Sequence, residues 1–268
     1  MSKKLSLSII LPIKSSKVKD FDMFFTKAIA SLEKQENDFD ELVIIHTKED
    51  SLVKYLNEYD FKSINVKKLA WDSEPNYCEQ INYGVENASS EWISLFEFDD
   101  EYSNIWFKNF KKYAEVYPEY GAFLPVVVDV DAKETFAGFT NEATFAANFT
   151  QEMGVLTNDI LQEYQNFQTS GIILKKDIFI STGGFKPSIK LTFSYEFLLR
   201  LTYNSTSVMT IPRLGYKHTN LREGSIFWNY KYDDNKITED EVKFWLQTAK
   251  KEYFFTTDRK IKYEIQNS

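Results

Sequence analysis

The sequence predicts an α/β fold in which a mostly parallel sheet is flanked by helices and followed by a C-terminal helical extension. Strand and helix patterns alternate through the first hundred of its 268 residues, which is the order that produces a parallel sheet with helices on its faces. Hydrophobic residues make up 43% of the chain, enough for a large core. No internal repeat and no linker rich in Gly, Pro or Ser interrupts the pattern.

The first half of the chain accounts for four strands and the helices between them. Short apolar or alternating runs bounded by polar residues predict strands at 7–13, 41–46 and 64–69 and from 92 onward. Apolar residues at helical spacing predict helices at 21–34, 50–58 and 76–88. Ligands of open parallel sheets bind beyond the carboxyl ends of the strands, where Lys14, His46 and the acids of 97–101 would meet.

The second half continues with weaker signals. It favours helices at 107–117 and 194–201, with Ser194 as a plausible N-cap of the latter. Strands are expected at 122–130, 170–174 and 208–211. Thr238 followed by Glu241 matches a capping box and predicts a last helix that packs back on the domain.

Residues 132–168 follow no regular pattern. Four phenylalanines, at positions 136, 139, 145 and 149, stand among small and polar residues there. They could form a lid on the acceptor side of a binding site or pack as core. We expect most of them in the core, since aromatic rings dominate core packing.

Charge and cysteine content narrow the possible functions. The net charge of -8 argues against a broad nucleic-acid surface, because such surfaces depend on Lys and Arg at phosphates. Cys78 is the only cysteine, so the chain has no intrachain disulfide, and a reducing, cytoplasmic location is expected. No stretch approaches the roughly 20 apolar residues of a transmembrane helix.

The most informative segment is 92–101, where an apolar strand pattern runs into four carboxylates. Glu97, Asp99, Asp100 and Glu101 would repel one another unless they are solvated or a hard cation such as Mg²⁺ or Mn²⁺ neutralises them. A divalent ion held by one or two carboxylates and by phosphate oxygens is a common way to bind nucleoside diphosphates. The alternatives are an acidic turn, or a site at the rival acids Asp129 and Asp131.

Read in order, these pieces resemble family 2 glycosyltransferases of the GT-A fold. Residues 8–12 (Ser-Ile-Ile-Leu-Pro) look like the family's first strand, which enters the sugar-nucleotide pocket at its proline, and 31–35 with 41–45 are similar to its passage into the second strand. Residues 82–88 match the Asn, Gly and Ala spacing before the metal-binding strand, and 97–100 (Glu-Phe-Asp-Asp) fall at the Asp-x-Asp motif. Residues 183–185 and 216–218 with Ser225 resemble the turn below the acceptor site and the late histidine segment.

The resemblance implies a GT-A-like domain at 1–215, with 216–268 folding back over the site. It also implies inverting transfer of a sugar from a nucleoside diphosphate, expected to be a UDP-sugar, to a hydroxyl of a saccharide or other acceptor. Asp99 is the first choice as ligand of Mn²⁺ or Mg²⁺, with Asp100, Glu97 and His218 completing the set. The expected donor-binding residues are Pro12, Lys14, His46, Asn82, Lys217 and Arg222, the last two at phosphate oxygens.

Two departures from the family pattern concern the site. The paired acids that commonly follow the second strand are replaced by His46 and Thr47, which leaves the base of the nucleotide open. Aligning on Arg200 puts Phe193 and Ser194 where the family carries the general base. The catalytic candidates are therefore Ser194 at that position and Glu196, two positions further on, as the nearest possible base. The alternative for Glu196 is a solvated carboxylate in the first turn of a helix.

Two other functions compete. A nucleotidyltransferase would place a glycine-rich basic loop after the first strand, and residues 12–17 contain no glycine. A sugar-nucleotide fold that survives as a binding or scaffold subunit is the second alternative, because serine cannot replace a carboxylate as base. Slow hydrolysis of a nucleotide sugar would distinguish an enzyme from a binding protein.

Overall fold

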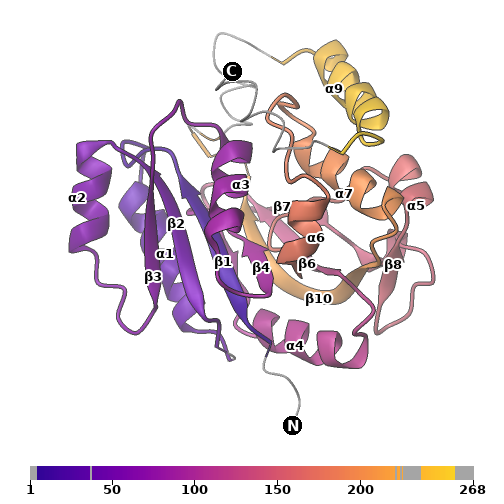
Figure 1. Cartoon of the computed structure of the whole chain (residues 1–268), viewed down its shortest axis with the longest axis horizontal. Coiled ribbons are helices and arrows are strands. Elements are labelled where there is room, and N and C mark those ends of the chain that lie inside the picture. Colours follow the sequence, from indigo (N-terminus) through magenta and orange to yellow (C-terminus); the bar gives the residue numbers. More distant parts are fainter. Residues whose placement is uncertain (1–4, 37, 221, 224, 226–236, 257–268) are drawn as a thin grey trace, which may run out of the picture.

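One mixed sheet forms the centre of the protein (Figure 1). The computed structural model describes residues 5–36, 38–220, 222–223, 225 and 237–256. The strand order is β3-β2-β1-β4-β9-β6-β10-β5, with β7 paired to β6 and β8 paired to β10. The strands are β1 (Leu7–Ile13), β2 (Glu41–Thr47), β3 (Val66–Trp71), β4 (Trp92–Leu95), β5 (Glu101–Tyr102), β6 (Ala122–Val130), β7 (Phe136–Thr140), β8 (Gly154–Leu156), β9 (Ile173–Lys175) and β10 (Val208–Thr219).

Strands β1 to β4 are parallel to one another, as the alternating pattern predicted. The short strand β9 then runs antiparallel between β4 and β6, and β10 returns parallel to β6. Because β1 and β4 point the same way, Pro12 and the acids after β4 reach the same edge of the sheet. The expectation of a mostly parallel α/β sheet is confirmed.

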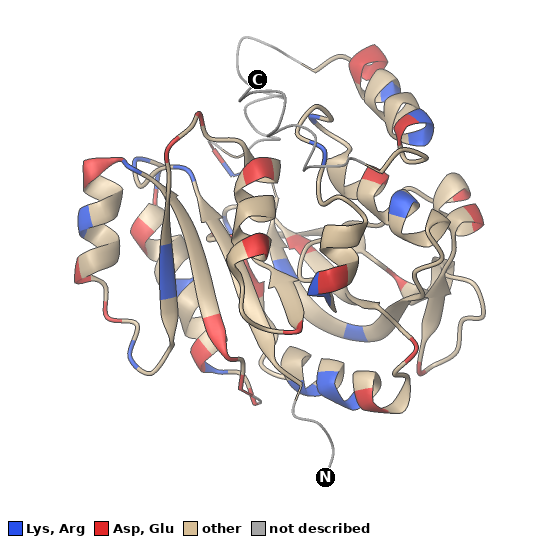
Figure 2. Ribbon diagram, in the orientation of Figure 1, with Lys and Arg blue, Asp and Glu red and all other residues tan. Residues whose placement is uncertain are grey.

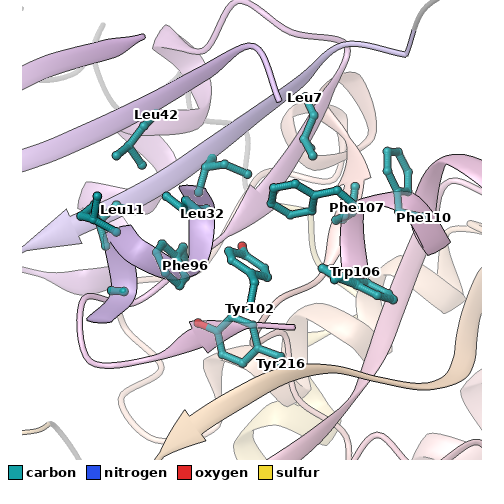
Figure 3. Close-up of a cluster of buried hydrophobic side chains, with 14 of the residues drawn as sticks. Leu7, Leu11, Leu32, Leu42, Phe96, Tyr102, Trp106, Phe107, Phe110 and Tyr216 are labelled. Atoms are coloured by element: carbon teal, nitrogen blue, oxygen red, sulfur yellow. The ribbon is translucent and has the colours of Figure 1, made fainter. Parts of the chain in front are cut away.

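Helices cover both faces of the sheet and enclose two cores. They are α1 (Phe21–Glu33), α2 (Asp50–Glu58), α3 (Tyr77–Asn87), α4 (Trp106–Val116), α5 (Asn158–Glu163), α6 (Lys176–Ser181), α7 (Phe193–Tyr203) and α9 (Glu239–Glu252), with a 3-10 turn, η1, at Ala143–Phe145. Helices α1, α2 and α4 pack on one face, where Trp106, Phe107 and Tyr216 meet β1 and β4 (Figure 3). Helices α3, α6 and α7 pack on the other face.

Several predicted elements match the structure closely. The strands at 7–13 and 122–130 and the helix at 50–58 have the expected bounds, and the other expected helices of the first half differ by one residue at one or both ends. Thr238 is the N-cap of the last helix, as expected, since its Oγ1 accepts a hydrogen bond of 3.1 Å from the backbone N–H of Glu241. Figure 2 shows the acidic first turn and the basic last turn of α9. These charges interact favourably with the helix dipole and stabilise the helix.

Other predictions were wrong. Ser194 is not an N-cap, because α7 begins at Phe193 with Thr192 as its N-cap. The phenylalanines of the irregular segment are not core residues: Phe136, Phe139, Phe145 and Phe149 are 58%, 40%, 40% and 46% exposed. Two of them pair as rings at 4.9 Å on β7 instead. Hydrophobic content alone predicted burial, and the topology placed this segment at the edge of the sheet.

The described C-terminal part of the chain packs against the rest of the fold. Strand β10 runs through position 215/216, so the boundary predicted there falls inside the sheet. Helix α9 packs against α7, with Ala249 buried in the second core. None of the helices in the described ranges is long and apolar enough to cross a membrane.

Candidate active site

A cavity of about 830 Å³ opens at the carboxyl ends of β1 and β4. One wall comes from the end of β1, the start of α3, the turn after β4 and the end of β10. Other lining residues come from the loop at 165–170, the start of α7 and Leu246 of α9. This is the edge of the sheet at which a parallel arrangement places its ligand site.

Three of the predicted metal ligands meet at this cavity. One ligand atom from each of Glu97, Asp100 and His218 lies within 4.8 Å of the other two. Glu97 and His218 line the cavity, and Asp100 is buried beside them. Two carboxylate oxygens and an imidazole nitrogen form a donor set that Mn²⁺ accepts readily and Mg²⁺ accepts through its oxygens.

The cluster carries more negative charge than its protein surroundings balance. Burial and the charge of Asp99 raise the pKa of Glu97 to about 7. Burial also raises the pKa of Asp100 well above its ordinary value, and neighbouring Glu97 adds to the shift. Burial opposes charging of His218, but Asp100, Asp129 and Glu97 outweigh it and raise the pKa of its imidazole to about 10. Ionising both acids is therefore costly in these surroundings, and an added cation would lower that cost.

The hydrogen bonds of Asp100 support the same conclusion. Its Oδ1 accepts a bond of 2.8 Å from the backbone N–H of Thr219, whereas its buried Oδ2 has no hydrogen-bond partner in the described part of the chain. A buried carboxylate oxygen without a partner costs free energy unless a ligand satisfies it. The residues present therefore fit a divalent cation.

Asp129 orients His218 for this role. It stands directly opposite His218 in the register between β6 and β10, and the Nδ1–H of His218 donates to Asp129 Oδ1 at 2.8 Å. Such a carboxylate fixes the ring and leaves the second ring nitrogen for a metal. The sequence marked Asp129 only as a rival acid, because the pairing of β6 with β10 could not be foreseen.

Asp99, the first choice from sequence, lies differently. Its Oδ2 accepts a short hydrogen bond from Nε of Arg222, and both side chains are buried. The guanidinium also lies 4.7 Å from the ring centre of Phe98. Asp99 is thus neutralised by a protein cation, while Glu97 and Asp100 are not.

The predicted donor-binding residues fall into two groups. Pro12, Lys14 and Arg222 line the cavity. Three others do not: His46 is buried with Nδ1 2.9 Å from the carbonyl oxygen of Thr47, Lys217 pairs with Glu101, and Asn82 is buried inside the fold. Lys217 and His218 are neighbours on a strand, so their side chains point to opposite faces.

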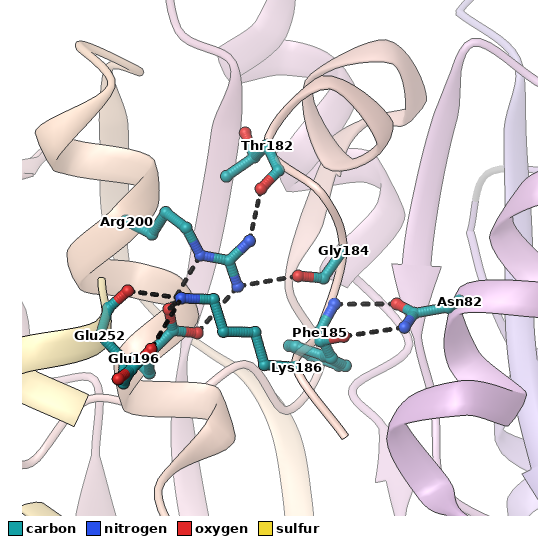
Figure 4. Close-up of polar contacts among 8 residues, drawn as sticks. All are labelled: Asn82, Thr182, Gly184, Phe185, Lys186, Glu196, Arg200 and Glu252. Atoms are coloured by element: carbon teal, nitrogen blue, oxygen red, sulfur yellow. Dashed lines mark hydrogen bonds and ion pairs between the residues drawn. The ribbon is translucent and has the colours of Figure 1, made fainter. Parts of the chain in front are cut away.

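Asn82 has a structural role. Its side chain accepts a hydrogen bond from the N–H of Phe185 and donates one to the carbonyl of the same residue, each of 2.8 Å (Figure 4). The turn before it depends on Gly184, whose φ is 65° and where a Cβ would collide with Asn82 Oδ1. Asn82 therefore joins α3 to the turn at 183–185 and does not line the cavity.

Glu196, the candidate base, is also inside the fold. It is 0% exposed, and its Oε1 and Oε2 accept bonds of 2.9 and 2.8 Å from the guanidinium of Arg200. Lys186 lies 3.1 Å from Oε1, and Arg200 also donates to the carbonyls of Thr182 and Gly184 (Figure 4). Glu196 is not among the cavity residues, so the structure does not bring this carboxylate to the acceptor.

Ser194, the other predicted catalytic residue, does line the cavity. Its Oγ accepts a hydrogen bond of 2.8 Å from the backbone N–H of Thr169 and lies 2.9 Å from Thr169 Oγ1. Tyr77 and Gln80, in the first turn of α3, also line the cavity, and the sequence reading did not single them out as site residues. Their place directly after a loop at the ligand-binding edge was the available signal.

An acidic cluster and a basic loop thus meet in one cavity at the ligand-binding edge of the sheet. The sequence profile of the family described as Glycosyl transferase family 2 matches residues 8–179. The chain belongs to this family, and it is a glycosyltransferase of the GT-A-like fold. No curated protein sequence matches it.

Solved structures of S. aureus TarS have a similar fold. TarS 1–349 in complex with UDP superposes with a TM-score of 0.61 at 15% identity, over 96% of this chain and 73% of that one. The complex of the same fragment with UDP-GlcNAc gives 0.64 at 16% identity, over 91% and 65%. The chain spans 44% of the longer TarS structure, with a TM-score of 0.59 and 14% identity.

Proposed function

We propose that this protein transfers a sugar from a UDP-sugar with inversion at the anomeric carbon, and that the transfer depends on Mn²⁺ or Mg²⁺. The observation that supports it best is the cluster of Glu97, Asp100 and His218 at the cavity, in which one buried carboxylate oxygen has no hydrogen-bond partner among the residues that the structure describes. Glu97, Asp100 and His218 would hold the ion.

A cation at this place would assist the chemistry. As the glycosidic bond breaks, negative charge accumulates on the leaving diphosphate, and a bound divalent ion stabilises that charge more in the transition state than in the ground state. Lys14 and Lys17, from the loop after β1, also line the cavity and can neutralise phosphate oxygens. Arg222 pairs with Asp99, so this acid would not compete with the diphosphate for the metal ion.

The choice of uridine follows from the comparisons. TarS, whose fold this chain shares, has been solved with UDP and with UDP-GlcNAc. UDP-GlcNAc is therefore the first donor to test, followed by other nucleotide sugars, since His46 and Thr47 replace the acids expected beside the base.

The test is a panel of nucleotide sugars measured by thermal shift with and without Mn²⁺. A bound donor raises stability by mass action, by roughly 2.7 kcal/mol at one hundred times its dissociation constant. We expect a UDP-sugar to raise the melting temperature only with the metal, and to be hydrolysed slowly without acceptor. Protection by no nucleotide sugar, or equal protection without metal, would contradict the proposal. Protection without any turnover would favour a binding protein.

A further inference from the structure

The wall of the cavity that is formed by the loop at 165–170 and the start of α7 carries polar groups that the donor site does not explain. The described carboxylates of the cavity are Glu97, Asp99 and Glu223, and none of them comes from this wall. Glu196 is turned into the fold and held by Arg200 and Lys186. A hydroxyl acceptor would find no side-chain base on the part of this wall that the structure describes.

The same wall is rich in hydrogen-bond donors. Helix α7 has 11 residues, and no side chain caps its N-terminus. The hydroxyl of its N-cap residue Thr192 donates to the carbonyl of Trp245 at 2.8 Å, so it is not available to the helix. Thr192, Phe193, Ser194 and Tyr195 all line the cavity, so the positive end of the helix faces it.

A second, independent observation comes from α3. Gln80 lines the same cavity, its side chain is 2% exposed, and its Nε2 has no hydrogen-bond partner among the described residues. The start of α3 reaches the start of α7, because the rings of Tyr77 and Phe193 lie 5.4 Å apart. A buried amide donor without an acceptor implies a ligand that accepts hydrogen bonds.

Ser194 and Thr169 complete the set. Their hydroxyl oxygens lie 2.9 Å apart, so their mutual hydrogen bond uses one of the two hydroxyl protons. The other proton is available to a ligand in the cavity. Donors from a helix N-terminus, an amide and a hydroxyl together form an anion site.

We propose that this wall binds an ionised phosphate group of the acceptor, and that one of its oxygens is the nucleophile. This inference rests on the proposed function. A lone pair of the phosphate oxygen forms the new bond to the anomeric carbon, while the bond from that carbon to the leaving diphosphate breaks and its electron pair stays on the diphosphate. The attacking oxygen carries no proton, so the step needs no base, and the product is a sugar 1-phosphate or its ester.

The binding test uses inorganic phosphate at pH 8 with protein already saturated with UDP and Mg²⁺, so that the donor phosphate positions are filled. We expect saturable binding by calorimetry. Ser194→Asp, which places a carboxylate at the helix N-terminus, and Gln80→Leu should each weaken it about tenfold or more. Ser181→Asp adds the same charge on α6, outside the cavity, and should leave it unchanged. UDP affinity should stay within about twofold throughout.

The turnover test uses the nucleotide sugar selected by the donor panel, with inorganic phosphate, an isoprenyl phosphate in micelles, or neutral saccharides as acceptors. Formation of a sugar 1-phosphate or its isoprenyl ester supports the inference, and the two products distinguish free phosphate from a lipid headgroup. Transfer to saccharides alone, or equal phosphate binding in Ser194→Asp, Gln80→Leu and wild type, would overturn it. Failure of UDP to bind would instead contradict the proposed function.

Discussion

The protein contains two clusters of buried acids that differ in how their charge is balanced. Glu196 is enclosed by Arg200 and Lys186, so protein cations neutralise it and the cluster joins α7 to the turn at 183–185. Glu97 and Asp100 share a single histidine, and one carboxylate oxygen has no hydrogen-bond partner among the described residues. The first arrangement is complete within the fold, whereas the second is where we propose that an added cation binds.

The largest expected effect is at the incomplete cluster. Asp100→Ala removes the acid with the unpartnered oxygen, so Mn²⁺-dependent binding of UDP should fall by about 10³ or more, measured by calorimetry. Asp177→Ala, on α6 and outside the cavity, serves as the control. UDP binding of wild-type strength in Asp100→Ala would remove this residue from the metal site.

The complete cluster should respond in stability. Glu196→Gln leaves Arg200 and Lys186 buried without their carboxylate, so the free energy of unfolding should fall by about 3 to 5 kcal/mol, measured by chemical denaturation. UDP affinity of the folded variant should not change. A variant with unchanged stability but turnover reduced about 10²-fold would instead return Glu196 to the role of base.

Asp129 tests how precisely His218 must be held. Asp129→Asn can still contact the ring but no longer favours its orientation by charge, so Mn²⁺ affinity should fall by about 10- to 100-fold. The melting temperature of the metal-free protein serves as the control for folding. Equal loss of stability and metal affinity would indicate a purely structural residue.

The last prediction concerns pH. Glu97, with a pKa raised to about 7, must lose a proton to bind a cation, so this group alone should raise Mn²⁺ affinity about tenfold between pH 6 and pH 8. His218, with a pKa raised to about 10, must also lose a proton to bind the ion, so it makes the rise steeper in the same direction. Because both pKa values are raised in the fold, metal-free stability should fall with rising pH from about 4.5 toward 10. Calorimetry at several pH values checks the affinity, and a flat profile would contradict the assignment.

Much of this architecture was predictable because local patterns repeat there. Residues 7–13 and 50–58 carry clear strand and helix periodicities, and the structure reproduces their bounds. The segment at 132–168 carries no such pattern, and its short strands β7 and β8 form only by pairing with β6 and β10. Strands of three to five residues depend on their partners more than on their own sequence.

The amino-acid sequence by itself determined the family, the parallel half of the sheet and the edge at which the acids gather, because these depend on periodicity and on order along the chain. Only the tertiary structure decided which acids are paired with cationic side chains. Asp99 meets Arg222, Glu196 meets Arg200 and Lys186, and Asp100 keeps an oxygen without a partner. The physical reason is that charge balance depends on neighbours up to 123 positions away in the chain, and a carboxylate's sequence context does not reveal which cation it will meet.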